Sequence, residues 1–234
     1  MGERTLAACA AGMTTGLAVS VLAASYHMMW RHRIATWGAT EDEAAAHLPG
    51  DELCPDPDFS TTRAIAISAP PNCVWPWLVQ MGSGRAGRYS YDWIENLFGL
   101  DMHSADVLLP QFQDLSPGDE FPCGRRDSVV RVEALDPEKR LTFGLFDGRW
   151  IASFALFPQR DTTRLICRNR VALPHASAMS RLLLTLLMEP ISLLFDHRML
   201  LGIKERAERP ARGCEFADDF PLRTDSYVWS GEHL

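Results

Sequence analysis

The first pattern along the chain is an uncharged, mostly apolar stretch from Thr5 to Trp30. As a helix it would be about 39 Å long, against a bilayer hydrocarbon core of about 30 Å. Basic residues follow it directly at Arg31 and Arg33, whereas Arg4 before it is offset by Glu3. Because cytoplasmic flanks carry the excess of basic residues, residues 5–30 are predicted to form one transmembrane helix that keeps the rest of the chain in the cytoplasm.

A cleaved signal peptide is the alternative for this stretch, since Ala23, Ala24 and Ser25 are small enough for a peptidase site. The protein would then be exported. The stretch lacks the basic residues that normally precede a signal peptide, so the anchor is preferred. Gly12 and Gly16 have the four-residue spacing that allows two membrane helices to pack closely, which would permit a homodimer, although an alanine-rich helix also shows this pattern by chance.

An acidic linker and then an alternating strand pattern follow the apolar stretch. Residues 31–62 form an acidic, proline-containing linker, in which Thr40 and Glu43 match a capping box for a short helix that ends near Leu48. Residues 63–68 then alternate in polarity like a strand, and residues 74–79 and 92–99 are predicted as short helices.

Alternating runs then predict four antiparallel strands at 129–135, 141–146, 150–157 and 163–171, with Asp147 and Gly148 as the clearest turn signal. Residues 177–208 are predicted as one long helix, which Pro190 should kink or restart. Charged residues make a second membrane span costly there. The acidic residues 210–234 are predicted to be poorly ordered.

This order predicts an α+β fold, in which a curved antiparallel sheet is covered on its concave face by the long C-terminal helix. Within residues 63–209, the runs 65–81, 89–99 and 199–204 resemble the SRPBCC superfamily, the START-like helix-grip group that includes polyketide cyclases and lipid-transfer domains. The resemblance implies a cavity for apolar ligands between sheet and helix. That superfamily has no universal catalytic motif, so the resemblance assigns no catalytic residue.

Composition excludes several classes of site. A net charge of −7 without a basic cluster argues against nucleic-acid binding. The six cysteines lack C-x-x-C or histidine spacing, so no metal and no cofactor is expected. Three disulfides are the alternative, but Cys73 and Cys167 lie in apolar segments and are predicted as buried thiols. Residues 82–87 match G-x-G-x-x-G, yet no strand precedes them, so a flexible loop that gates a cavity is preferred.

The densest polar and aromatic run is 89–106. One hypothesis makes His103 an acid-base group with Asp92, Glu95 or Asp106 as its partner. The other assigns these residues to capping and core packing, with the run forming the mouth of a ligand cavity. The predicted ligand-binding residues are Trp77, Tyr89, Tyr91, Trp93, Met102, His103, Trp150, Arg168 and Glu189.

Arg164, Arg168 and Arg170 share one face of the last strand. They are expected to face solvent. If that face lined the cavity instead, Arg168 would pair with an acidic ligand group or with Glu189, because a buried charge needs a partner.

Three functions remain open at this point. The preferred one, which depends on the resemblance, is a membrane-anchored domain that binds a hydrophobic small molecule, either a lipid or a polyketide-like compound. The second is an enzyme of the cyclase or dehydratase type that uses His103 with a carboxylate. The third is a membrane scaffold that self-associates through its anchor.

Overall fold

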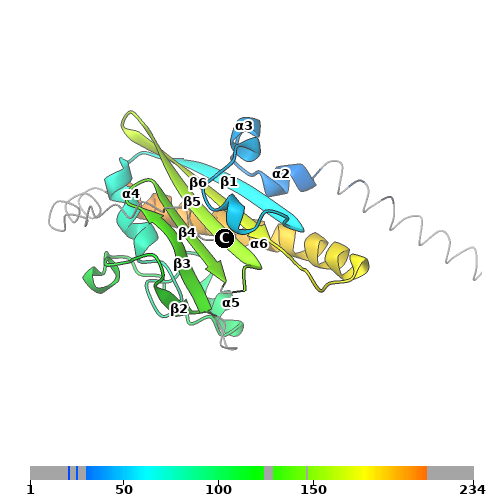
Figure 1. Ribbon diagram of the computed structural model, residues 1–234. Coiled ribbons are helices and arrows are strands. Elements are labelled where there is room, and N and C mark those ends of the chain that lie inside the picture. Colours follow the sequence, from blue (N-terminus) through cyan, green and yellow to red (C-terminus); the bar gives the residue numbers. More distant parts are fainter. Residues whose placement is uncertain (1–20, 22–24, 26–29, 124–128, 146, 210–234) are drawn as a thin grey trace, which may run out of the picture.

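The computed structural model describes residues 21, 25, 30–123, 129–145 and 147–209. Six antiparallel strands form one sheet in the order β1-β6-β5-β4-β3-β2, and the long helix α6 packs against it (Figure 1). The α+β fold is therefore confirmed. The strands are β1 (Phe59–Ile67), β2 (Glu120–Pro122), β3 (Val129–Asp136), β4 (Arg140–Leu145), β5 (Trp150–Gln159) and β6 (Thr162–Val171). The helices are α2 (Arg31–Ala35), α3 (Glu41–Ala45), η1 (Asp51–Leu53), α4 (Pro71–Val79), α5 (Asp92–Leu97), η2 (Pro110–Phe112) and α6 (Ala178–Ala207).

Most of the predicted anchor, including Gly12 and Gly16, lies outside the described residues, as does the segment 210–234. Several element boundaries differ from the sequence prediction: α3 ends at Ala45 rather than near Leu48, and α4 begins at Pro71 rather than Val74. Strand β1 begins at Phe59 rather than Arg63, so the end of the predicted linker belongs to the sheet. The short edge strand β2 was not predicted, because three residues are too few to show alternation.

The first strand of the domain pairs with the last, so β1 forms one edge of the sheet and β2 forms the other. Phe59 lies opposite Val171, and Ile67 lies opposite Thr163. On the inner face, α4 and the second half of α6 bury large apolar side chains, including Trp75, Trp77, Met199, Leu200 and Ile203. Gly202 allows α6 to approach the backbone at Tyr89, because a β-carbon there would collide with the Tyr89 carbonyl. These contacts place the α4–α5 loop against the sheet and α6.

The linker covers the outer face of the sheet. Arg164 forms an ion pair with Glu43 at 2.7 Å, and both Arg168 and Arg170 pair with Asp51. The prediction that this arginine row faces solvent is wrong in one respect: the row does lie on the outer face, but residues of the linker bury or half-bury it. The sequence contains both sets of charges, but they are more than 100 residues apart, so their pairing was not evident.

Helix α6 runs as one helix through Pro190, so the predicted restart does not occur. In Figure 1 its first half, coloured yellow, extends past the strand ends. Within the part of the chain that the structure describes, α6 is the one helix long and apolar enough to cross a membrane by length and composition.

The cysteines do not form three disulfides, because Cys54, Cys123 and Cys167 are free thiols. Cys167 is buried, as predicted. Cys73 is disulfide-bonded, so the prediction of a free buried thiol is wrong at that position.

Candidate functional site

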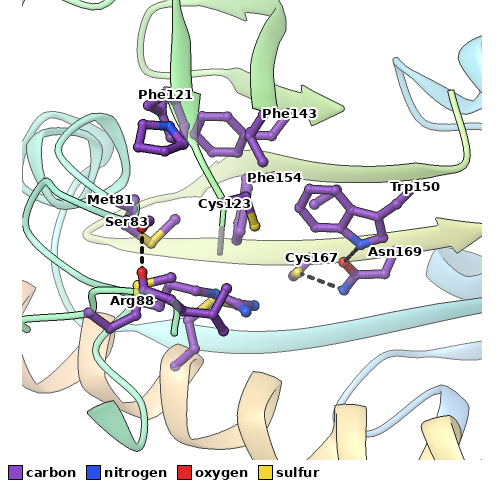
Figure 2. A pocket seen from close by; sticks show the side chains of 17 residues that line it. Met81, Ser83, Arg88, Phe121, Cys123, Phe143, Trp150, Phe154, Cys167 and Asn169 are labelled. Carbon is purple, nitrogen blue, oxygen red and sulfur yellow. Dashed lines mark hydrogen bonds between the residues drawn. The ribbon is translucent and has the colours of Figure 1, made fainter. Parts of the chain in front are cut away.

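A cavity of about 80 Å³ lies between the inner face of the sheet and α6 (Figure 2). Its wall is mainly apolar and aromatic. Strands β4, β5 and β6 contribute one wall, the loop between α4 and α5 contributes another, and α6 contributes Met199. The principal lining residues are Met81, Ser83, Arg88, Leu100, Met102, Phe121, Cys123, Phe143, Trp150, Ala152, Phe154, Cys167, Asn169 and Met199.

The strand residues reach the cavity because side chains alternate between the two faces of a sheet. Ala152 and Phe154 are two apart on β5, and Cys167 and Asn169 are two apart on β6. The intervening Arg168 therefore points to the outer face. Of the predicted ligand-binding residues, Met102 and Trp150 line the cavity.

The glycine-rich loop builds the second wall. Gly82 and Gly87 form two backbone hydrogen bonds to each other, at 3.0 and 3.2 Å. A β-carbon on Gly87 would lie 2.7 Å from the Ser104 nitrogen, so glycine allows the close contact with residues 103–104. The Ser83 hydroxyl donates to the Leu100 carbonyl, and the Gly84 amide donates to the Asp101 carbonyl. The loop is thus tied to the segment after α5, which places Ser83, Leu100 and Met102 beside one another.

A polar cluster borders the apolar wall. The Asn169 amide accepts a hydrogen bond from Trp150 Nε1 at 3.2 Å and donates one to Asp196 at 3.0 Å. Asp196 forms a buried ion pair with Arg63. Figure 2 shows Trp150 and Asn169 on one side of the cavity and Arg88 on the other.

Arg88 is the charged residue in the cavity wall. Its guanidinium lies 3.4 Å from Glu95 and 3.8 Å from Asp196. The cluster thus contains two guanidinium groups, on Arg63 and Arg88, and two carboxylates, on Glu95 and Asp196. These charges balance, so the cluster leaves no net charge for an ionic ligand to neutralise.

Two free thiols line the cavity as well. Burial raises the pKa of both Cys123 and Cys167 above the ordinary value. Both are therefore thiols at neutral pH, and a thiol is a much poorer nucleophile or metal ligand than a thiolate. Within the described ranges, no group of three histidine, cysteine or acidic side chains lies close enough together to hold a metal ion.

The predicted acid-base residues do not come together. His103 has a side chain 75% exposed, and its Nε2 lies 3.1 Å from Oδ1 of Asp101. Asp92 accepts hydrogen bonds from the amide and hydroxyl of Ser104, both at 2.6 Å. Glu95 is buried and accepts from Ser90 at 2.8 Å. The partner of His103 is thus Asp101, which was not among the predicted partners.

The aromatic candidates have different environments. Trp77 and Tyr89 are buried in the core, where the Tyr89 hydroxyl donates to the Trp77 carbonyl at 3.0 Å. Burial raises the pKa of Tyr89, so its hydroxyl is protonated. Tyr91 makes an edge contact with Phe195, and Trp93 is exposed.

Neither charged candidate faces the cavity as the sequence suggested. Arg168 donates to Thr62 at 2.9 Å, to Asp51 at 2.6 Å and to three linker carbonyls, so it anchors the linker. Glu189 pairs with Arg31 at 2.8 Å instead of with Arg168.

Sequence reasoning missed Asn169, Arg88 and Phe154. One available signal was the alternation of β6, which places Asn169 on the same face as Cys167. Arg88 carries no comparable signal, because the glycine-rich loop positions it.

Neither a protein-family model nor a curated protein matches the chain. Several solved structures are similar. Protein MLL2253 from Mesorhizobium loti is 17% identical with a TM-score of 0.41, over 65% of this chain and 98% of that one. The Polyketide_cyc-like protein Cgl2372 from Corynebacterium glutamicum is 14% identical with a TM-score of 0.37, over 64% and 91%. DynU16, described as a putative protein in the dynemicin biosynthetic locus, is 16% identical with a TM-score of 0.39, over 65% and 50%. Similarities this low assign neither a family nor an activity.

Proposed function

We propose that the chain is a membrane-tethered domain that binds a small, neutral, apolar molecule in the cavity between the sheet and α6. The observation that carries this proposal is the cavity itself. It combines an apolar and aromatic wall with a few polar groups, as small-molecule sites in proteins generally do.

The size of the cavity limits the ligand. At about 80 Å³ it is much smaller than the roughly 300 to 1,000 Å³ of sites for drug-sized molecules. A single ring or the end of an acyl chain matches this space better than a whole lipid or polyketide does. The sequence predicted a lipid or polyketide-like ligand. The cavity volume limits this prediction to a ligand of which only one ring or one chain end enters the protein.

The charge of the cavity limits the ligand further. Arg88 is already paired with Glu95 and Asp196, and the Asn169 amide is bonded to Trp150 and Asp196. An acidic ligand would have to compete with these carboxylates for Arg88. A neutral molecule avoids that competition, because it leaves the ion pairs of Arg88 intact.

The tether remains part of the proposal. The predicted membrane segment 5–30 ends beside Arg31, and Arg31 forms its ion pair with Glu189 of α6. This contact supports a domain held close to its membrane segment, and Arg31 and Arg33 after that segment are the reason for proposing the cytoplasmic side. No specific observation favours the enzyme or the scaffold alternative: His103 is exposed beside Asp101, and Gly12 and Gly16 lie outside the described residues.

Native mass spectrometry of the full chain tests the proposal. The wild-type protein should carry a co-purifying small molecule or accept fluorobenzene as a probe, whereas Ala152→Leu should abolish either complex by filling the cavity. The matched control is Ala45→Leu, the same change at an exposed position on α3. Binding that is equal in all three proteins, or absent from the wild type, would contradict the proposal.

A further inference from the structure

The first half of α6 has an apolar stripe on its exposed side. Leu183, Leu187, Ile191 and Leu194 are three or four residues apart, so they share one helix face. Their side chains are between 38% and 59% exposed. We call these four residues the α6 stripe. Such a continuous row differs from the single exposed apolar residues that are normal on protein surfaces.

The opposite face of the same helix is polar and turned inward. Thr185, Glu189, Ser192 and Asp196 follow the same spacing, and the first, second and fourth are buried. Glu189 pairs with Arg31, while Ser192 and Asp196 bind Arg63. Between Leu182 and Phe195 the sole charged residue is thus the inward-facing Glu189.

This arrangement is the reverse of what an aqueous surface favours, where apolar residues face the core and charged residues face solvent. It is typical of helices in lipid, whose ionisable residues turn inward and pair with one another. The ion pairs of Glu189 with Arg31 and of Asp196 with Arg63 compensate the inward-facing charges, and the leucine and isoleucine side chains of the opposite face remain exposed within the described residues.

The neighbouring chain segments have the same character. The predicted membrane segment ends at Trp30, next to Arg31, and Arg31 contacts α6 through Glu189 within the stripe's length. Tyr91, the residue before α5, makes an edge contact with Phe195 of α6, so α5 begins beside the helix that carries the stripe. There Trp93, Leu97 and Phe98 are 69% to 71% exposed, and tryptophan is enriched at membrane interfaces.

We propose that the α6 stripe, together with the exposed apolar residues of α5, lies in the acyl-chain layer of a lipid bilayer. The stripe is about 17 Å long at 1.5 Å per residue, too short to cross a core of about 30 Å. It therefore enters one leaflet, as interfacial helices do. This inference goes beyond the proposed function, because it assigns a membrane-facing surface that is separate from the cavity-lining residues.

The position of α5 gives this contact a functional consequence. The chain leaves α5 and reaches Leu100 and Met102, which line the cavity. With α5 in the interface, the cavity wall stands next to the acyl chains. An apolar ligand would then move between membrane and cavity with little exposure to water.

A photo-crosslinking experiment on the full chain identifies what covers the stripe. Leu187 is replaced by p-benzoyl-phenylalanine, and the protein is reconstituted in vesicles of phosphatidylcholine and phosphatidylglycerol and irradiated. Intact-mass analysis should show a mass shift equal to one phospholipid. The same probe at Lys139, exposed in the β3–β4 turn, should show no such shift.

Other adducts would overturn the inference. A crosslink to residues 5–30 of the same chain, or to a second copy, without a lipid adduct would identify a protein occupant. No adduct at position 187, or equal lipid adducts at 187 and 139, would also overturn it. The ligand measurement with Ala152→Leu does not depend on this surface, so failure here and failure of the proposed function are distinguishable.

Discussion

Arg63 and Asp196 form a buried ion pair that joins β1 to α6. Arg63 also donates to Ser192, and Asp196 accepts from Asn169 in the cavity wall. A buried ion pair adds little net stability because both charges lose their hydration, but a single remaining charge is costly. The pair therefore matters most for fixing the position of α6 relative to the cavity.

Asp196→Ala should lower the free energy of unfolding by about 3 to 5 kcal/mol, because it leaves the Arg63 guanidinium buried without its carboxylate. Urea unfolding of the full chain in detergent, followed by tryptophan fluorescence, measures the change. The control is Asp136→Ala, whose exposed pair with Lys139 at 3.8 Å should contribute less than about 1 kcal/mol. Equal losses in the two variants would contradict this account.

Between neighbouring elements, the linker is fastened to the outer face of the sheet through α3. The capping box predicted from Thr40 and Glu43 is confirmed, with hydrogen bonds of 3.1 and 2.8 Å. The Glu43 carboxylate also accepts two hydrogen bonds from Arg164, at 2.8 and 2.7 Å. One residue therefore both starts the helix and attaches it to β6.

The stability gained from Glu43 should depend on pH. Hydrogen bonds from Arg164 hold the pKa of Glu43 below its ordinary value of 4.5. Ionised Glu43 thus stabilises the folded protein above that ordinary value, and the gain is lost as the pH falls through the lowered pKa. Glu43→Gln should reduce stability by about 0.5 to 1 kcal/mol at pH 7, with no difference from wild type at the acidic end.

Thermal unfolding of both proteins across this pH range provides the measurement. Glu120→Gln, at an exposed position on the edge strand β2, is the control and should show a much smaller difference at pH 7. A loss for Glu43→Gln that stays constant down to the lowest pH would mean that the charge of Glu43 is not the cause.

For the whole molecule, the proposed membrane attachment combines two features of the chain. The predicted anchor 5–30 and the α6 stripe are independent features, one from the sequence and one from the structure. Arg31 joins them, since it follows the predicted anchor directly and pairs with Glu189. A chain held at both places would present the cavity to one leaflet in a fixed orientation.

If residues 5–30 are an uncleaved anchor that keeps the domain in the cytoplasm, two results are expected in bacterial spheroplasts. The membrane fraction should retain the mass of the full 234-residue chain after an alkaline carbonate wash. Externally added protease should leave the domain intact until the membrane is permeabilised, because Arg31 and Arg33 favour the cytoplasmic side. A product that begins after Ser25 would instead establish the signal-peptide alternative.

Local patterns in the sequence were sufficient for most of the longer elements, although they missed the three-residue strand β2. The capping box at Thr40, the alternating strands, the turn at Gly148 and the length of the last helix each depend on residues within a few positions of one another. Each pattern has its own physical cause in side-chain periodicity or hydrogen bonding, so each was readable without the rest of the chain. Together they determined the α+β class.

The site depended on contacts between distant segments. Arg63 of β1, which pairs with β6, binds Asp196 of α6. Arg168 lies on the outer face, where it binds the linker through Asp51, whereas its neighbour Asn169 faces the cavity. Contacts between distant segments also decided which face of α6 points inward. Glu189 and Asp196 lie on the inner face because Arg31 and Arg63 pair with them there. Sequence alone determined the main helices and strands and their order, apart from the short strand β2 and the start of β1. The tertiary structure decided which faces meet, because a charge is buried only where a distant partner compensates it.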